Sequence, residues 1–487
     1  MFYGNIYATK SEARVLTRQQ TRRPAPDPNR RPRRDPLLKV LRGKQPANLE
    51  EVAKPVDRGS TAAVRRSGPS GWLQLLGPGL ITGASDDDPS GIGTYSQIGS
   101  QFGYGLLWTA LFTFPLMAAV QELCARIALE TGVGLGVALR RRFPTALVGL
   151  CIFALMAANT INVGADLGAI GAGGELLSRG LLKHQWLVLP AALLVVGLQF
   201  RLPYGTIFRV FKWLTLALFA YVVTAFIVHP DLRAVVAATF VPHLEFKREF
   251  ITALVAVLGT TISPYLFFWQ ASSEVDEMRA AGLLKEQQRR GVSLQELHAA
   301  RADILVGMFF SNLVMYFIIL VAGAVLHAHG KTDIQTADQA AAALAPIAGP
   351  FGFVLFAVGL IGTGLLAIPI LSGSAAYALK EFFRLPGNLA AKPQYRPTFY
   401  AIMAGAVVIG GALNFVGIDP IRALFITAVI NGLVAPPLLV LIVLLGSDRR
   451  VMKDKVSGPL SKGLTWAATA LMTIAALALL VTTLLAH

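Results

Sequence analysis

The sequence is poor in cysteine and in charged residues, and each shortage excludes a class of protein. Only two cysteines occur among 487 residues, Cys124 and Cys151, and each lies in an apolar stretch without a CxxC partner. A disulfide framework and a thiolate metal cluster are therefore excluded. Charged residues make up 15% of the chain and hydrophobic residues 54%, with a mean hydropathy of +0.56. Such an excess of hydrophobic residues is not typical of soluble globular proteins and indicates a protein embedded in lipid.

Catalytic motifs and strand-like alternation are missing as well. The sequence contains no HExxH, no GxSxG and no P-loop, which argues against a membrane-embedded enzyme. Apolar residues come in blocks of roughly 20, the length with which a helix crosses a bilayer. This pattern excludes an outer-membrane barrel and predicts an all-α polytopic membrane protein.

Acidic residues are too few to balance the basic ones, and the excess is concentrated near the N-terminus. The net charge is +16, and residues 1–70 hold 16 Lys and Arg against 6 Asp and Glu in a proline-rich stretch. This stretch lacks the apolar residues of a core or of a signal peptide. We expect residues 1–70 to form a disordered cytoplasmic tail attracted to anionic lipid rather than to nucleic acid. Residues 71–487 then form the membrane domain.

Apolar blocks predict about eleven transmembrane helices in the membrane domain. The blocks cover residues 73–100, 105–130, 146–174, 185–200, 206–229, 250–273, 302–327, 350–379, 398–415, 420–445 and 463–485, with an amphipathic connector over 281–301. If the N-terminus is cytoplasmic, every inside loop is basic, as the positive-inside rule requires. These loops include Arg140, Lys212, Arg289, Lys392 and Lys453. The chain is thus predicted to lie in the cell inner membrane with its N-terminus inside and its C-terminus outside.

The first and sixth blocks are each interrupted by a proline among small polar residues. The first contains GASDDDPSGIG over residues 83–93, and the sixth contains GTTISPY over residues 259–265. Proline removes a helix hydrogen-bond donor, so both helices should break. Paired broken helices five blocks apart predict an inverted five-plus-five helix repeat, with halves at about 73–229 and 250–445 and an extra C-terminal helix at about 463–485. In such transporters the substrate binds where the breaks meet.

Three consecutive carboxylates, Asp86, Asp87 and Asp88, occupy the first break. Each costs roughly 2.5 to 3.5 kcal/mol at the centre of a membrane helix, so they predict a functional site. Thr260, Thr261 and Ser263 lie at the second break, where no Met, Cys or His occurs. Carboxylate, hydroxyl and carbonyl oxygens suit hard cations such as Mg²⁺, Mn²⁺ or Ca²⁺. The pattern therefore predicts a divalent metal site between the breaks.

The stretch GPGLITGASDDDPSGIGTYSQIGSQFGYGLLW resembles the first helix of the Nramp divalent-metal transporters, whose motif there is DPGN. The second break and the eleven-helix layout extend this resemblance over roughly residues 71–487. It implies that Asp88 binds the transported metal. Gly91 stands where the family has its asparagine ligand, and Ser263 and Tyr265 stand where the family has methionine and histidine. Ala169 replaces the glutamate of the family's Asp-x-x-Glu motif, which begins here at Asp166.

These departures resemble the Nramp-related magnesium transporters, a divergent branch. They imply transport of Mg²⁺, with Mn²⁺ as a second ion, by alternating access and without proton coupling. The alternatives are a classical proton-coupled Mn²⁺/Fe²⁺ symporter and an amino-acid or organic-cation carrier of the same fold. No cofactor is expected besides the transported metal, and the oligomeric state is left open.

The candidate residues fall into two groups. The predicted metal site comprises Asp86, Asp87, Asp88, Gly91, Thr260 and Ser263, and the predicted cavity lining comprises Thr261, Tyr265, Asn159, Asp166 and Asn431. Asn159, Asn162 and Asp166 share one helical face, which fits a polar lining but fits an interhelical hydrogen-bond network slightly better. Gln270, Glu274, Asp276 and Glu277 are expected to mark the inner end of block six in a solvated loop.

Overall fold

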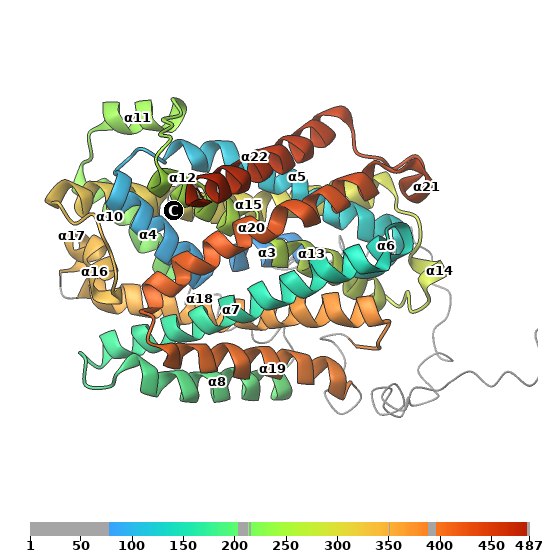
Figure 1. Ribbon diagram of the computed structural model, residues 1–487, viewed down its shortest axis with the longest axis horizontal. Helices are drawn as coiled ribbons and strands as arrows, with labels where there is room; N and C mark the ends of the chain where they lie inside the picture. The colour runs from blue at the N-terminus through green and yellow to red at the C-terminus, as the bar shows by residue number, and fades with distance from the viewer. Residues whose placement is uncertain (1–76, 203–212, 214–215, 350, 388–395, 485–487) are drawn as a thin grey trace, which may run out of the picture. The chain divides into compact units, whose positions relative to one another are not determined.

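The computed structural model describes residues 77–202, 213, 216–349, 351–387 and 396–484, and every regular element within them is a helix (Figure 1). The tail predicted over residues 1–70 lies outside the described residues. So do residues 206–212 and 214–215 of the fifth predicted block.

The first half of the membrane domain contains two short helices where a single spanning block was predicted. Its helices are α3 (Pro78–Asp86), α4 (Pro89–Phe102), α5 (Trp108–Thr131), α6 (Leu135–Arg142), α7 (Thr145–Leu177), α8 (His184–Arg201), η2 (Leu216–Leu218), α10 (Phe219–Val228) and α11 (Leu232–Phe240). The turn between α3 and α4 is the predicted first break.

The second half contains the matching break, between α12 and α13. Its helices are α12 (Arg248–Thr261), α13 (Pro264–Ala280), α14 (Glu286–Arg289), α15 (Leu294–Val325), η3 (His327–His329), α16 (Ala337–Ala341), η4 (Ala342–Leu344), α17 (Ala345–Ala348), α18 (Phe351–Phe383), α19 (Pro397–Leu413), η6 (Asn414–Val416), α20 (Pro420–Ser447), α21 (Arg449–Met452) and α22 (Pro459–Leu484). Both breaks end at a proline in the first position of the next helix, where its missing N–H costs nothing.

Eight spans among the described residues are long and apolar enough to cross a membrane, the broken pair α12–α13 counting as one of them. The three remaining predicted blocks correspond to α3–α4, to α8 and to α10, which are shorter or less apolar. The multi-span membrane architecture is therefore confirmed, while the number eleven stays a prediction.

One predicted boundary is wrong. The connector expected over 281–301 ends early, because α15 begins at Leu294 rather than near residue 302. Ser293 caps its first turn by accepting from the Glu296 N–H, and the Glu296 side chain accepts in return from the Ser293 N–H. This capping box starts a polar helix well before the apolar run begins. At 32 residues, α15 is about 48 Å long, longer than the roughly 30 Å hydrocarbon layer.

Each broken helix packs on a long helix of the opposite half of the membrane domain. The first broken helix, α3–α4, packs on α15, and the second, α12–α13, packs on α5. The third and eighth predicted blocks, α7 and α18, pack along each other, and α8 lies beside α19 (Figure 1). The two breaks are therefore enclosed by helices that run without interruption.

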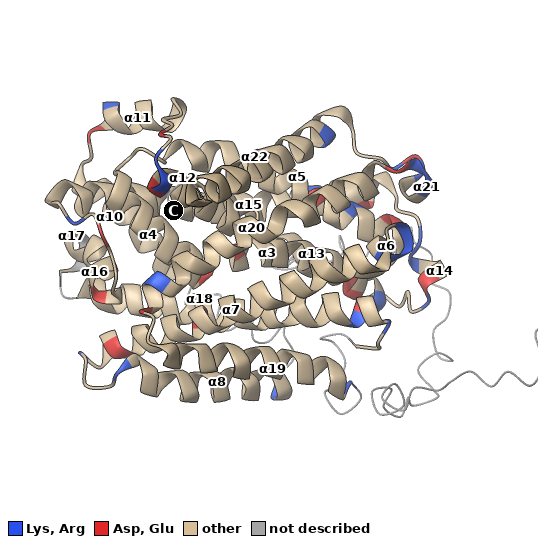
Figure 2. Ribbon diagram, viewed as in Figure 1, with Lys and Arg blue, Asp and Glu red and all other residues tan. Residues whose placement is uncertain are grey.

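Basic loops that were predicted to share one side of the membrane do meet in the structure. Arg141 of α6 forms an ion pair with Glu286 of α14, and Arg142 forms one with Asp448 before α21. Figure 2 shows basic and acidic segments gathered where α6, α14 and α21 come together. We call this the basic end of the helix bundle. The connections near Gly103 and His327 meet each other separately, through a hydrogen bond from His327 to the Ser100 carbonyl.

Candidate metal-ion site

Asp88 is both the last residue of the first break and the cap of α4. Its Oδ1 accepts hydrogen bonds from the Gly91 N–H at 2.9 Å and from the Ser90 hydroxyl at 2.5 Å. Aspartate is a favoured cap because its carboxylate satisfies an amide that the first helical turn leaves free, and the following Pro89 fits the first turn. The cap fixes one carboxylate oxygen and leaves Oδ2 facing neighbouring helices.

Two other helices converge on Asp88 Oδ2. The Asn162 side-chain amide of α7 and the Tyr265 hydroxyl of α13 each lie 3.3 Å from it. The Tyr265 hydroxyl also lies 3.0 Å from the Ser85 carbonyl, which the end of α3 leaves without a helical partner. Ser374 of α18 in turn donates to the Tyr265 carbonyl at 2.6 Å. Asp88 therefore lies where the two breaks and α7 meet.

The three consecutive aspartates face different helices. Asp86 and Asp87 both accept from the Ser311 hydroxyl of α15, at 2.6 and 3.2 Å, whereas Asp88 faces α7 and α13. All three aspartates are buried, with at most 7% of any of them exposed. Within the described residues no three His, Cys, Asp or Glu side chains converge in a metal-binding cluster. A metal site here must therefore combine a carboxylate with amide, hydroxyl or carbonyl oxygens.

Hydroxyls at the second break all donate to backbone carbonyls of α12. Thr260 donates to Val257, Thr261 also to Val257, and Ser263 to Gly259 and Thr260. These bonds use each hydroxyl proton and leave oxygen lone pairs available to a cation. Gly91 contributes its N–H to Asp88, and a β-carbon built there would lie 3.1 Å from the Tyr95 ring. A side chain at position 91 would therefore crowd the cap.

The polar face of α7 holds one residue with an interhelical hydrogen bond and others with unpartnered oxygens. Asn159 donates to the Leu371 carbonyl at 3.1 Å, which fits the interhelical network. Asp166, in contrast, is fully buried, and neither of its carboxylate oxygens has a hydrogen-bond partner among the described residues. The same holds for both amide atoms of Asn431 on α20 and for the side-chain carbonyl of Asn162. These oxygens remain available to a hydrated cation.

The solvated-loop interpretation of Gln270 and Glu274 is wrong. Both residues are buried on α13, where the Gln270 amide donates to Glu274 at 3.1 Å. The Thr82 hydroxyl of α3 donates to Gln270 at 2.5 Å. The error arose because the helix continues to Ala280 and packs against α3, α5 and α18. These polar residues join α3, the first half of one broken helix, to α13, the second half of the other.

Sequence reasoning missed Ser311 and did not place Asn162 among the site residues. Ser311 lies in the middle of the apolar α15, where one serine is common and carries no motif. Its role appears only when α15 packs on α3. Asn162 was recognisable from its position four residues before Asp166 on one helical face.

Comparisons with known proteins identify the family. The family model described as Natural resistance-associated macrophage protein-like, Nramp, matches residues 79–482. The divalent metal cation transporter MntH of Klebsiella pneumoniae is 26% identical over 424 residues, covering 86% of this chain and 95% of the relative. The divalent metal cation transporter MntH of Deinococcus radiodurans is 28% identical over 386 residues, covering 78% of this chain and 83% of the relative.

Solved structures show the same fold. The crystal structure of the Eremococcus coleocola manganese transporter, in complex with an aromatic bis-isothiourea substituted compound, superposes with a TM-score of 0.64. It is 17% identical, covering 88% of this chain and 90% of that protein. The family match spans both helix breaks and the helices around them. This multi-pass membrane protein therefore belongs to the Nramp family of transporters and is not an enzyme.

Proposed function

We propose that the chain carries a divalent metal cation across the membrane and that the cation binds at Asp88. The observation that carries the proposal is the convergence of Asn162 and Tyr265 on one buried carboxylate between two helix breaks, with the Ser85 carbonyl beside the same Tyr265 hydroxyl. A buried carboxylate surrounded by neutral oxygen donors favours a cation over an anionic or zwitterionic solute. Alternating exposure of this position to the two sides of the membrane would move the ion.

Mn²⁺ is the leading substrate. The relatives are named for divalent metal cations, and the solved neighbour is named a manganese transporter. Carboxylate, carbonyl and water ligands suit Mn²⁺ as well as Mg²⁺, so the oxygen-rich surroundings of Asp88 agree with both ions. The names favour Mn²⁺ over the Mg²⁺ implied by the resemblance to the divergent branch.

Mg²⁺ is the second candidate because of the residue at position 263. Ser263 offers a hydroxyl where a methionine would offer a thioether, and its hydroxyl lies at the cap of α13. Mg²⁺ loses its water shell reluctantly and binds poorly to sulfur, so a site without a thioether admits it more readily.

Uptake into proteoliposomes that contain the purified chain would test the proposal. The solutes are Mn²⁺, Mg²⁺, Ca²⁺, Cd²⁺ and a set of amino acids, each measured at equal concentration. We expect uptake of Mn²⁺, and uptake of Mg²⁺ if Ser263 has the effect described. Amino-acid uptake with no uptake of any metal would overturn the proposal.

A further inference from the structure

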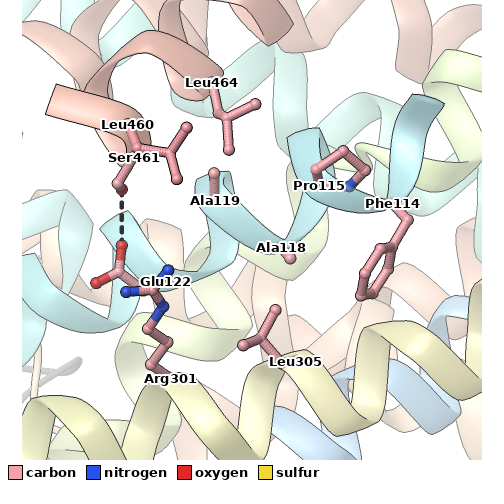
Figure 3. Close-up of a pocket in the computed structure, with 10 residues that line it drawn as sticks. All are labelled: Phe114, Pro115, Ala118, Ala119, Glu122, Arg301, Leu305, Leu460, Ser461 and Leu464. Atoms are coloured by element: carbon pink, nitrogen blue, oxygen red, sulfur yellow. Dashed lines mark hydrogen bonds between the residues drawn. The ribbon is translucent and has the colours of Figure 1, made fainter. Parts of the chain in front are cut away.

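A pocket lies between α5, α15 and α22, apart from the metal-ion site. Its walls are apolar and are formed by Phe114, Pro115, Ala118, Ala119, Leu305, Leu460 and Leu464 (Figure 3). Its volume is about 160 Å³, below the roughly 300 to 1,000 Å³ of pockets that enclose a small molecule. The pocket therefore suits one end of a larger molecule held elsewhere.

The other end of the pocket is polar and carries more positive than negative charge. Glu122 is already satisfied, because Arg126 forms an ion pair with its Oε1 and the Ser461 hydroxyl donates to its Oε2 at 2.8 Å. Arg301 extends from α15 into the pocket toward the end where Glu122 lies (Figure 3). Within the described residues it has neither an ion pair nor a hydrogen bond. One arginine is thus left to bind an external anion.

The position of this arginine matches the surface of the bilayer. Arg301 lies in the polar start of α15, Leu294–Asp303, and the apolar run begins at Ile304. Arg126 also donates to the Lys455 carbonyl, in the loop between α21 and α22, so the polar end of the pocket belongs to the basic end of the bundle. From there the apolar walls continue toward the membrane interior, and Leu460 is 69% exposed beside them.

We propose that this pocket binds an anionic membrane phospholipid. Arg301 pairs with the headgroup phosphate, and part of an acyl chain lies along Phe114, Leu305 and Leu464. Basic pockets between transmembrane helices at the inner surface are suited to anionic headgroups. The exposed apolar walls contact acyl chains of any lipid, so selectivity for an anionic headgroup depends on Arg301. A bound lipid would link α22 to α5 and α15.

Native mass spectrometry of the purified full chain would test the proposal. The protein is mixed with equal amounts of phosphatidylglycerol and phosphatidylethanolamine of identical acyl chains, and the ratio of bound lipids is measured. The wild type should retain phosphatidylglycerol preferentially. Arg301→Gln should lower the ratio about fivefold, the effect of one arginine near a membrane surface.

Arg422→Gln is the matched control. It removes the same charge from the first turn of α20, which is about 42 Å long and ends at Ser447, beside Asp448 of the basic end. Its lipid ratio should equal that of the wild type. Leu464→Trp fills the pocket without changing its charge and should reduce retention of both lipids. An unchanged ratio in Arg301→Gln, or an equal fall in Arg422→Gln, would overturn the proposal.

Discussion

The hydroxyl of Tyr265 lies 3.0 Å from the Ser85 carbonyl and 3.3 Å from the Asp88 carboxylate. A phenol has a single proton, so it can donate to only one of these oxygens at a time. When a cation occupies the carboxylate, the proton can stay with Ser85 while a phenol lone pair faces the ion. Tyr265 thereby joins the second broken helix to the first and remains compatible with a bound metal.

Removing this hydroxyl should weaken both the site and the fold. Tyr265→Phe is expected to lower stability by about 0.5 to 1.5 kcal/mol, the net value of a typical hydrogen bond, and to lower metal affinity. Thermal unfolding and calorimetric titration with Mn²⁺ measure the two effects. Tyr221→Phe, a buried tyrosine outside the site, should leave the affinity unchanged. Equal affinity in both variants would remove Tyr265 from the site.

Asp88 should be indispensable for transport. Asp88→Ala removes the carboxylate on which Asn162 and Tyr265 converge, so metal uptake should fall to the level of empty liposomes. Asp86→Ala and Asp87→Ala should each have a smaller effect, because these aspartates share Ser311 and attract a hydrated ion together. Size-exclusion profiles would verify that the variants remain folded. Wild-type uptake by a folded Asp88→Ala protein would exclude Asp88 as the ligand.

The residue at position 263 should control metal selectivity. A thioether binds partly dehydrated Cd²⁺ well and a hydrated hard ion poorly, so Ser263→Met should strengthen Cd²⁺ binding and weaken Mg²⁺ transport. Because Gly91 stands where the family has an asparagine ligand, we expect this change in metal selectivity to be incomplete. Calorimetry with Cd²⁺ and competition for uptake measure both effects. Ser263→Ala, which adds no sulfur, should not gain Cd²⁺ affinity. If Ser263→Met changes neither measurement, this residue does not line the metal path.

Transport is expected to proceed without stoichiometric proton entry. Ala169 cannot titrate, and a phenol exchanges few protons at neutral pH because its ordinary pKa is near 10, so Tyr265 is a poor proton carrier. A pH-sensitive dye inside proteoliposomes would detect protons that enter with the metal. Acidification equal to the metal uptake would contradict this expectation and would direct attention to the buried Asp166. Asp166→Asn would then be expected to abolish the acidification.

The ion pair at the basic end should give a small, pH-dependent stabilisation. The hydrogen bonds from Arg141, and then those from Arg290, lower the pKa of Glu286 to about 2. Because an unfolded glutamate has a pKa near 4.3, the stabilisation is complete above that pH and is lost as the pH falls toward 2. Both partners are solvent-accessible, so Glu286→Gln should cost only about 0.2 to 1 kcal/mol at neutral pH.

Thermal unfolding from pH 7 to pH 3 measures this effect. The difference between wild type and Glu286→Gln should shrink once the pH falls below about 4. Glu249→Gln makes the same change at an exposed residue that has no ion pair among the described residues. It should leave the unfolding temperature nearly unchanged. A difference for Glu286→Gln that persists at pH 3 would show that charge pairing is not its cause.

The sequence alone determined the membrane architecture, the two helix breaks and the identity of the charged residue at the first break. These features follow from local chemistry: apolar length sets a spanning helix, and proline interrupts it wherever the chain folds. Asp88 was recognisable because a carboxylate in an apolar segment is costly and because it precedes Pro89. The polar face of α7 was also visible, since residues four apart lie on one side of a helix.

Tertiary structure alone decided which oxygens face one another. Asp86, Asp87 and Asp88 are three consecutive carboxylates in the sequence, but the break turns the first two toward Ser311 and the third toward Tyr265. Gln270 and Glu274 were misassigned because their polarity suggests solvent, whereas the packing of α13 on α3 gives them buried partners. Burial and hydrogen bonding depend on helices far apart in the chain, and hydropathy and spacing report only on each helix itself.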